Sequence, residues 1–322
     1  MVVKIGKAIE TQLRNAHYGV YNHSAVQICP WTKKSIKNMG ECYKNTFYGI
    51  ETHRCMEFSP AAVFCQNNCI FCWRKMEFMR NFKMEDVDEP RDIYENLLKE
   101  RKQLLSGFFG NESVDRKKLE EALGPTHFAI SLSGEPTLYP KLPELIKFLK
   151  KLDDTKTIFL VTNAQEPDMF EKLKKRKALP TQLYISTNAP NKALFKRINV
   201  PVYSDAWERF IESLEIASGM RTRVVMRLTM IKGLNMKQEL VDGYCKLIET
   251  LNPHFIEVKA YMWVGYSRRR LKEENMPSHD EVKNYAKKIA QASGFKFIDE
   301  RSESRVVLLQ NKSNIIDRFI KM

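Results

Sequence analysis

The amino-acid sequence predicts an α/β fold in which six strand–helix units form a barrel or part of one. Apolar, β-branched runs recur along the chain, stretches with helical period lie between them, and polar residues follow the successive runs. Strands that alternate with helices form parallel sheets, and right-handed crossovers would curl six such units into a partial barrel. An open doubly wound sheet is the competing arrangement, but no Gly-x-Gly-x-x-Gly follows the first run, which disfavours dinucleotide binding.

The six apolar runs locate the strands of the predicted barrel. They lie at Ala61–Phe64, His127–Leu132, Thr157–Thr162, Gln182–Thr187, Arg223–Met230 and Phe255–Ala260. Helical period marks the intervening stretches, for example Leu142–Leu152 and Trp207–Ala217. The sequence therefore divides into an N-terminal segment, 1–58, a barrel, 59–270, and a C-terminal extension, 271–322.

The two ends of the chain show different patterns. Residues 1–58 have little strand character. The tail contains a further helix from Met276, then short apolar runs at Phe295–Ile298 and Arg305–Leu309. A mixed polar and apolar stretch ends the chain, and we expect it to form a helix that covers an open edge.

Charge and composition limit the class of partner. The 322 residues carry 53 Lys and Arg against 39 Asp and Glu, a net charge of +14. Such an excess favours a polyanion, although a generally basic proteome would produce it too. Basic clusters at Lys172–Lys177 and Arg268–Lys272 favour nucleic acid. The N-terminus is charged and no run approaches the roughly 20 apolar residues of a membrane span, so we expect a cytoplasmic protein without a membrane partner.

Three cysteines follow the first apolar run, at Cys65, Cys69 and Cys72. Thiolates at this spacing can surround one soft metal centre, and three ligands leave one iron of a four-iron cube open. A zinc site more often uses paired Cys-x-x-Cys spacings closed by a fourth ligand. The spacing therefore indicates an iron–sulfur cluster with an open position.

Three more cysteines lie upstream and are evenly spaced. Twelve residues separate Cys29 from Cys42, and twelve more separate Cys42 from Cys55. These cysteines suggest a second, auxiliary three-ligand cluster formed where the N-terminal segment folds across the barrel mouth. Cys245 lies in a helical pattern far from the others, and we interpret it as a small buried hydrophobic residue.

Polar residues stand where each later strand is expected to end. The carboxyl ends of parallel strands meet at one edge of the sheet, so these residues should converge, although Ser, Thr and Asn are also ordinary loop and cap residues. The candidates are Ser133, Gly134, Glu135, Thr162, Asn163, Ser186, Asn188, Arg227, Thr229 and Asn235.

The motifs resemble those of the radical S-adenosylmethionine superfamily. Cys65, Cys69, Phe71 and Cys72 match its Cys-x-x-x-Cys-x-aromatic-Cys signature, and Ser133–Pro136 resembles its Gly-Gly-Glu-Pro turn with the first glycine replaced. The resemblance implies that S-adenosylmethionine binds the open iron and that Phe71 and the strand-end candidates contact it. Reductive cleavage of this cofactor gives a 5′-deoxyadenosyl radical, which abstracts hydrogen from an unactivated C–H bond.

A narrower resemblance is to the archaeal enzymes that form the tricyclic wyosine base of tRNA. It covers essentially the whole chain, including both cysteine triads and the segments 131–140, 184–189 and 227–233. It implies two [4Fe–4S] clusters and a reaction of N1-methylguanosine, next to the anticodon of phenylalanine tRNA, with pyruvate as two-carbon donor to give 4-demethylwyosine. Eukaryotic members carry a flavodoxin-like domain, so the resemblance implies a separate ferredoxin- or flavodoxin-like electron donor here.

Lys44 stands two residues after Cys42, so a fold that makes Cys42 a cluster ligand brings its amine close to the auxiliary cluster. A desolvated lysine can form a Schiff base with a keto acid. The alternatives are that the open auxiliary iron chelates pyruvate, or that Lys44 contributes positive charge for RNA. We expect the anticodon stem-loop to contact basic residues at Arg74, Lys75, Lys172, Arg176, Arg268, Arg269 and Arg270.

Two other functions remain open from the sequence. A zinc-dependent RNA-binding protein would use the cysteines structurally, but zinc gives no reason for the Ser133–Pro136 turn. Another two-cluster radical enzyme could use the auxiliary cluster as an electron relay and act on a different substrate.

Overall fold

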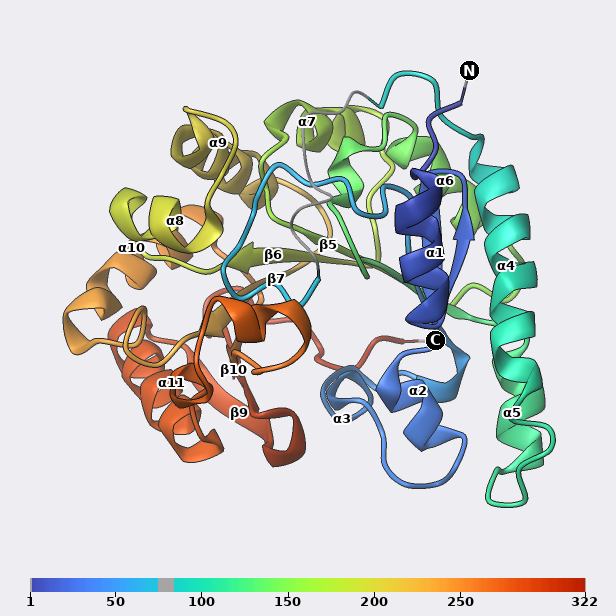
Figure 1. Ribbon diagram of the computed structural model, residues 1–322. Helices are drawn as coiled ribbons and strands as arrows, with labels where there is room; N and C mark the ends of the chain where they lie inside the picture. Colours follow the sequence, from blue (N-terminus) through green and yellow to red (C-terminus); the bar gives the residue numbers. More distant parts are fainter. Residues whose placement is uncertain (1, 75–83, 322) are drawn as a thin grey trace.

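A single ten-stranded sheet organises the protein (Figure 1). The computed structural model describes residues 2–74 and 84–321. The strand order is β1-β2-β3-β4-β5-β6-β7-β8-β10-β9. The strands are β1 (Tyr18–Tyr21), β2 (Ser24–Gln27), β3 (Cys55–Ser59), β4 (His127–Ile130), β5 (Thr157–Thr162), β6 (Gln182–Thr187), β7 (Arg223–Met230), β8 (Phe255–Ala260), β9 (Lys296–Arg301) and β10 (Val306–Gln310). Strands β3 to β8 run parallel, which confirms the predicted α/β partial barrel.

Antiparallel hairpins extend both edges of this parallel core. The β1–β2 hairpin pairs with β3, and the β9–β10 hairpin pairs with β8. The predicted division at 58 therefore falls inside β3, and the segments on both sides of 58 and of 270 contribute strands to one sheet.

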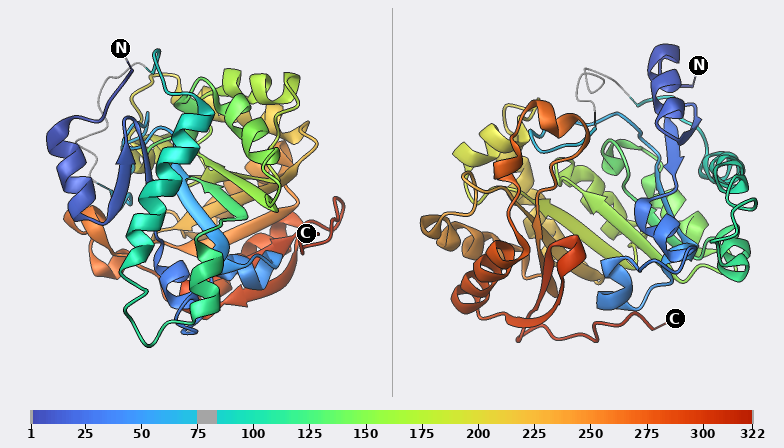
Figure 2. Two further views of the ribbon diagram at one scale, coloured as in Figure 1. Left: turned by 90° about the vertical axis from the view of Figure 1, so that its right-hand side faces the viewer. Right: turned by 60° about the horizontal axis from the view of Figure 1, so that its bottom comes forward.

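The helices lie mainly on the outer face of the curved sheet (Figures 1 and 2). They are α1 (Lys7–Asn15), α2 (Pro30–Ser35), α3 (Tyr43–Tyr48), α4 (Pro90–Ser106), α5 (Arg116–Ala122), α6 (Leu142–Lys150), α7 (Pro167–Lys175), α8 (Lys192–Asn199), α9 (Ala206–Ser218), α10 (Val241–Leu251) and α11 (His279–Ser293). No helix within the described ranges is long and apolar enough to cross a lipid bilayer.

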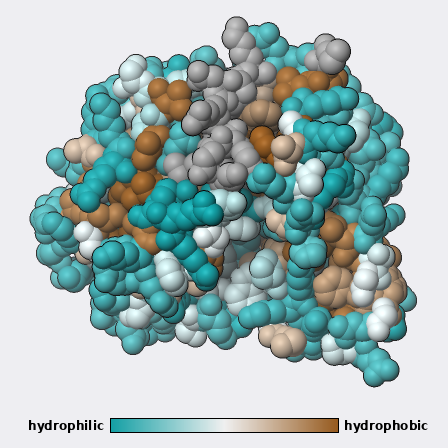
Figure 3. Space-filling model, viewed as in Figure 1, coloured by the Kyte–Doolittle hydropathy of each residue, from teal (hydrophilic) through white to brown (hydrophobic). Residues whose placement is uncertain are grey.

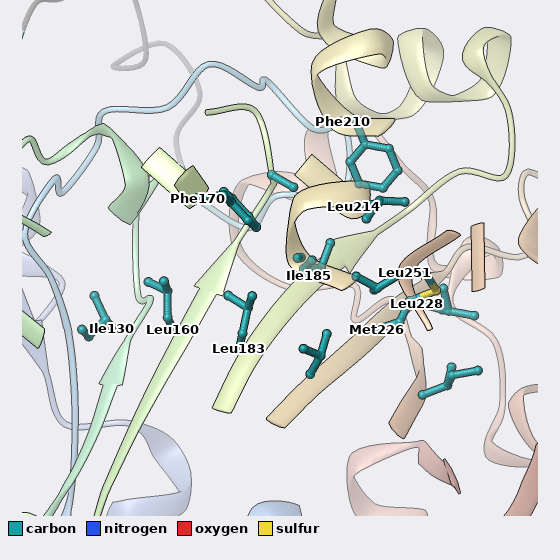
Figure 4. Packing of buried hydrophobic residues seen from close by; sticks show 14 of the residues in the cluster. Ile130, Leu160, Phe170, Leu183, Ile185, Phe210, Leu214, Met226, Leu228 and Leu251 are labelled. Carbon is teal, nitrogen blue, oxygen red and sulfur yellow. The ribbon is translucent and has the colours of Figure 1, made fainter. Parts of the chain in front are cut away.

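The outer face of the sheet forms the main hydrophobic core. Ile130, Leu160 and Leu183 come from three neighbouring strands and pack, fully buried, with helix residues such as Phe170 and Phe210 (Figure 4). Each buried side chain of this size stabilises the fold by about 1.5–3 kcal/mol. The core fixes the strands, and hence the positions of the residues at their ends.

The inner face of the sheet is filled at one end only. There Phe159, Tyr184 and Phe255 pack against Phe47 of α3, and the C-terminal residue Ile320 joins this cluster. The backbone N–H of Ile320 also donates to the carbonyl of Tyr48, at 3.1 Å. Helix α3 and the C-terminal stretch therefore close one end of the barrel.

The other end of the barrel interior is open and polar. Glu57, Ser186, Arg227 and Lys259 keep part of their surface accessible, whereas their neighbours along each strand are buried. Because side chains alternate between the two faces of a strand, these residues all face the interior. Ser186 and Arg227 line the cavity of the candidate site.

Two of the predicted elements are wrong. The run Ala61–Phe64 is not a strand, because its residues form a turn in which Val63 has a φ of +67°. The first strand of the barrel is instead β3, with Met56 and Phe58 buried on its outer side. The run is apolar because the turn itself is buried.

The C-terminal helix predicted to cover an edge is also absent from residues 311–321. The side chain of Asn311 accepts from the N–H groups of Ser313 and Asn314, which is a local alternative to helical bonds. Arg223 donates to the carbonyls of Asp317 and Arg318, so these carbonyls also bind outside a helix.

Candidate active site

The loop that carries Cys65, Cys69 and Cys72 is held by backbone hydrogen bonds at the open end of the barrel. The N–H of Asn68 donates to the carbonyl of Val200, at 3.1 Å, and the N–H of Ile70 donates to that of Ile198, at 2.9 Å. Burial raises the pKa of the Cys69 thiol, and the neighbouring Cys65 and Cys72 raise it further. The three sulfurs therefore share one desolvated space, where binding of thiolate by a metal would offset the cost of burial.

The turn at Ser133–Pro136 packs directly against this loop. Gly134 has a φ of +74°, and a Cβ at this position would lie 2.0 Å from the carbonyl oxygen of Ala61. The next residue, Glu135, donates its backbone N–H to the carbonyl of Phe64, at 2.6 Å. Only glycine permits this approach of two backbones.

Ser133 replaces the first glycine of the superfamily turn and is accommodated locally. Its hydroxyl accepts a hydrogen bond from the backbone N–H of Val63, at 3.3 Å. Val63 is itself in the left-handed region, so the hydroxyl satisfies a donor in a strained turn. The replacement thus ties the turn to the cysteine loop.

A cavity of about 230 Å³ lies between the cysteine loop and the strand ends. It is lined by the three cysteines and by every predicted cofactor contact except Asn235: Phe71, Ser133, Gly134, Glu135, Thr162, Asn163, Ser186, Asn188, Arg227 and Thr229. Six further residues line the cavity that the sequence did not predict as cofactor contacts: Asn67, Trp73, Arg74, Ser131, Leu132 and Val161.

Asn235 supports the cavity from behind. Its side chain accepts from the N–H of Ile231, at 2.6 Å, and donates to the carbonyls of Asn188 and Thr229, each at 2.8 Å. All three of these hydrogen bonds join the Asn235 side chain to backbone atoms. Asn235 therefore positions two strand ends that line the cavity.

Polar atoms in the lining are left for a ligand. The side-chain oxygens of Asn67 and Asn188 and the Nη1 of Arg74 are buried and have no hydrogen-bond partner among the described residues. Buried polar groups are normally paired. A polar ligand such as S-adenosylmethionine, with its ribose, amino and carboxylate groups, therefore fits this lining.

The upstream cysteines also come together. Cys29 and Cys42 are the N-cap residues of the short helices α2 and α3, and Cys55 begins β3. Burial raises the pKa of the Cys42 thiol to about 12, and the nearby Cys29 adds to this rise. Burial also raises the pKa of the Cys55 thiol, with further contributions from Cys29 and Cys42.

A buried arginine stands beside this second triad. Arg101 of α4 is fully buried and donates to the carbonyls of Ala122 and His53, but its Nη1 has no partner within the described ranges. Burial lowers the pKa of its guanidinium to about 10, whereas Cys55 and Cys29 act in the opposite direction. A buried cation with a free donor next to these sulfurs fits an anionic, thiolate-ligated cluster.

The thiols are not arranged for a single ion. In residues 2–74 and 84–321, no three His, Cys, Asp or Glu side chains form a group that could hold one metal ion. Each cysteine of a four-iron cube binds a separate iron, so a cube accepts more widely spaced thiols than a tetrahedral zinc does. Three cysteines in each triad match the three protein ligands of a cube with one open iron.

Lys44 lies in the barrel interior, close to the second triad. Its Nζ is 4.5 Å from the ring centroid of Phe159 and 4.8 Å from that of Tyr184. Burial raises the pKa of the nearby Glu57 carboxyl, and Lys44 opposes this rise. Among the described residues, Lys44 makes no hydrogen bond and no ion pair. Its contacts are the two aromatic rings and the longer-range interaction with Glu57.

The predicted RNA-binding residues separate into two groups. Arg74 donates to the carbonyl of Leu132, and Arg270 donates to those of Ile70 and Cys72, so both brace the walls of the cavity. Arg268 and Arg269 stack over Trp263 and Tyr266.

The remaining basic residues lie elsewhere. Arg176 pairs with Glu144, and Lys172 is exposed on α7 in the outer layer. Lys75 lies outside the described residues. Hydrophilic side chains cover much of the face that Figure 3 shows.

Comparison with known proteins agrees with this geometry. A family model described as the Radical SAM superfamily matches residues 60–242, and one described as Wyosine base formation matches residues 250–311. An S-adenosyl-L-methionine-dependent tRNA 4-demethylwyosine synthase from Pyrococcus horikoshii is 43% identical over 98% of this chain and 94% of its own length. The corresponding enzyme from Methanocaldococcus jannaschii is 41% identical over 95% of this chain and 96% of its own length.

A solved structure shows the same similarity. The structure of TYW1 with a lysine–pyruvate adduct bound matches with a TM-score of 0.87 and 40% identity, over 98% of this chain and 99% of that one. The similarity therefore extends over both cysteine triads, the barrel and both edge hairpins. This chain belongs to the family of S-adenosyl-L-methionine-dependent tRNA 4-demethylwyosine synthases.

Proposed function

We propose that this enzyme converts N1-methylguanosine, next to the anticodon of phenylalanine tRNA, into 4-demethylwyosine with pyruvate as the two-carbon donor. The observation that carries the proposal is that one cysteine triad lines a cavity at the strand ends, while Lys44 lies beside the other triad and over the interior ring of Tyr184. One triad suits the generation of a radical, and the lysine beside the other suits the activation of a keto acid. Family membership supplies the substrate class.

The two triads would hold two [4Fe–4S] clusters. We assign Cys65, Cys69 and Cys72 to the cluster that binds S-adenosylmethionine, and Cys29, Cys42 and Cys55 to an auxiliary cluster. When bound and reduced, the first cluster supplies the electron that cleaves S-adenosylmethionine. The residues around the 230 Å³ cavity bind and orient this cofactor and exclude competing reactions.

Lys44 is the residue that we assign to pyruvate. Its amine is desolvated between two aromatic rings and makes no hydrogen bond within the described part of the chain, so it is available to attack a keto carbon. The relative with a lysine–pyruvate adduct supports a covalent role for a lysine in this family. The second candidate, chelation of pyruvate by an open auxiliary iron, uses the same space.

The tRNA would approach the open end of the barrel, with the target base turned out of its loop. Arg268 and Arg269, which stand on aromatic rings near this end, are our candidates for phosphate or base contacts. We assign the electrons to a separate ferredoxin- or flavodoxin-like protein.

Anaerobic incubation of the reconstituted protein tests the proposal. The mixture contains S-adenosylmethionine, pyruvate, a reductant and tRNA bearing N1-methylguanosine, and nucleosides are analysed by mass spectrometry. We expect 4-demethylwyosine that carries two carbons from labelled pyruvate. S-Adenosylmethionine cleavage without any tricyclic product under these conditions would contradict the assigned reaction.

A further inference from the structure

A second lysine faces the same interior as Lys44. Lys259 lies on β8, where its neighbours Val258 and Ala260 are buried on the outer side, whereas Lys259 itself keeps part of its surface accessible. Strands β7 and β8 are paired so that Lys259 lies opposite Thr229 and Glu257 lies opposite Arg227. Lys259 is therefore a diagonal neighbour of Arg227 in the sheet. Two interior cations therefore occupy neighbouring strands.

Lys259 lacks the carboxylate partner that a deeply placed ammonium normally has. Within the described ranges it forms no ion pair, and its Nζ donates to the backbone carbonyl of Ser304, at 2.8 Å. The nearest interior carboxylate belongs to Glu257 and is already engaged. Tyr48 donates to one of its oxygens, at 2.7 Å, and Tyr43 donates to the other, at 3.1 Å.

The two lysines face the same region from different elements. The Nζ of Lys259 lies 5.3 Å from the ring centroid of Tyr43, the residue before Lys44. Lys44 and Arg227 both lie over the ring of Tyr184, at 4.8 and 5.7 Å. Both lysines also act electrostatically on the Cys42 thiol, where each opposes the rise of its pKa, so the two side chains border the same part of the interior.

The two amines differ in what holds them. Lys259 donates one hydrogen bond to the carbonyl of Ser304, and its ammonium form has two further N–H bonds for a ligand. Lys44 lies over the rings of Phe159 and Tyr184 and makes no hydrogen bond among the described residues, so no protein acceptor holds its amine in place. The first arrangement suits anion binding, and the second suits nucleophilic attack.

We propose that the Lys259 ammonium binds the carboxylate of pyruvate and so presents the keto carbon to the amine of Lys44. This inference rests on the proposed function and adds the residue that selects a keto acid over a neutral ketone. In the step at Lys44, the amine nitrogen adds to the keto carbon and one water leaves, which gives the imine. Lys259 keeps its protons and forms no covalent bond.

Borohydride trapping tests the inference without cluster reduction or tRNA. The reconstituted full-length protein is titrated with pyruvate or with methyl pyruvate, which has the same keto group but no negative charge. Intact mass and peptide mapping then report the amount and the position of the reduced adduct. The variants are Lys259→Met, Lys259→Arg and, as a control, Lys288→Met, an exposed lysine of α11.

We expect the unmodified sequence to trap pyruvate on Lys44 at a concentration about tenfold or more below that needed for methyl pyruvate, as a hydrogen-bonded charge would give. Lys259→Met should raise the half-saturating pyruvate concentration by about the same factor and abolish the preference. Lys259→Arg should keep most of the preference, and Lys288→Met should change nothing. Iron content, measured in parallel, shows whether each variant is folded.

The possible failures are distinguishable. If neither the parent protein nor any variant traps pyruvate, the role of Lys44 as the residue that binds pyruvate covalently is wrong. If the parent traps pyruvate but Lys259→Met keeps both the half-saturation and the preference, only the role of Lys259 is overturned. An adduct on Lys259 itself would also overturn it. If Lys259→Met does not retain iron, the Lys259→Arg variant decides. A folded Lys259→Arg protein that no longer prefers pyruvate over methyl pyruvate would contradict the role of Lys259.

Discussion

Each cysteine triad has neighbours that suit a different task. Cys65 and its partners line a cavity with polar strand ends, whereas Cys42 and its partners adjoin Arg101 and Lys44. We expect Cys65→Ala to abolish cleavage of S-adenosylmethionine, because the cofactor loses its cluster. Cys42→Ala should leave measurable uncoupled cleavage but give no tricyclic product. Chromatography of 5′-deoxyadenosine and of nucleosides measures both, and product from Cys42→Ala would disprove the auxiliary role.

Gly134 is the residue where a single methyl group should have the largest effect. A Cβ there meets two carbonyl oxygens, at 2.0 and 2.6 Å, and the left-handed φ of +74° alone costs about 1–2 kcal/mol for a non-glycine residue. Gly134→Ala should therefore weaken S-adenosylmethionine binding by a factor of about 10 or more. Gly110→Ala is the matched control, since nothing lies within 4 Å of its Cβ position. Equal affinities in equilibrium dialysis would refute this role.

Residues at strand ends could be predicted, but residues brought in by packing could not. Arg227 and Thr229 follow from strand position, because parallel strands end at the same edge. Arg101 lies on the buried face of a helix, four residues after Leu97, and nothing local indicates that Cys29 and Cys55 would be its neighbours. The in–out alternation of β8 places Lys259 on the interior side, but its contact with Tyr43 depends on where α3 packs, which the strand pattern does not indicate.

At the scale of elements, the parallel strands agree with their sequence patterns and the edges do not. β5, β6, β7 and β8 have the predicted bounds, because runs of five or more residues rich in apolar and β-branched side chains are distinctive. The four-residue strands β1 and β2 were missed, since such short runs acquire strand structure only by pairing with β3. The turn at Ala61–Val63 was mistaken for a strand because burial, rather than strand pairing, accounts for its apolar composition.

The first residue of β4 predicts a pH dependence of stability. His127 is buried, its Nδ1 donates to Thr157, and its Nε2 accepts from the N–H of Glu51, so the ring is neutral. Burial lowers its pKa to about 4. The unfolded chain binds a proton near pH 6.5 and the folded protein does not, so stability is full above pH 6.5 and falls by about 3 kcal/mol as the pH approaches 4.

Urea unfolding of the iron-free protein at several pH values measures this loss. His127→Gln should be less stable at pH 7.5 but should lack this part of the decline towards pH 4. His17→Asn, at an exposed position with a φ of 60° that Asn tolerates, should retain the full decline. An unchanged decline in His127→Gln would mean that other groups cause it.

At the scale of the whole molecule, the net charge of +14 predicts salt-sensitive binding of tRNA. If the open end neutralises three phosphates, the dissociation constant should rise on the order of 40-fold between 50 and 200 mM salt. Replacing Arg268 and Arg269 together by Ala should reduce this slope. Lys192→Ala, which removes a lysine paired with Glu208, is the control. Filter binding across a salt series measures the slopes, and equal slopes would place the RNA on another surface.

We infer that one barrel interior joins radical generation to pyruvate activation on a methylated guanine. The most direct test uses tRNA whose N1-methyl group on guanosine carries three deuterium atoms. The protein is incubated with this tRNA, pyruvate and S-adenosylmethionine under reducing, anaerobic conditions, and 5′-deoxyadenosine is analysed by mass spectrometry. We predict that 5′-deoxyadenosine acquires deuterium in step with 4-demethylwyosine formation. Formation of the tricyclic base with no deuterium in 5′-deoxyadenosine would show that the adenosyl radical does not take hydrogen from the N1-methyl group.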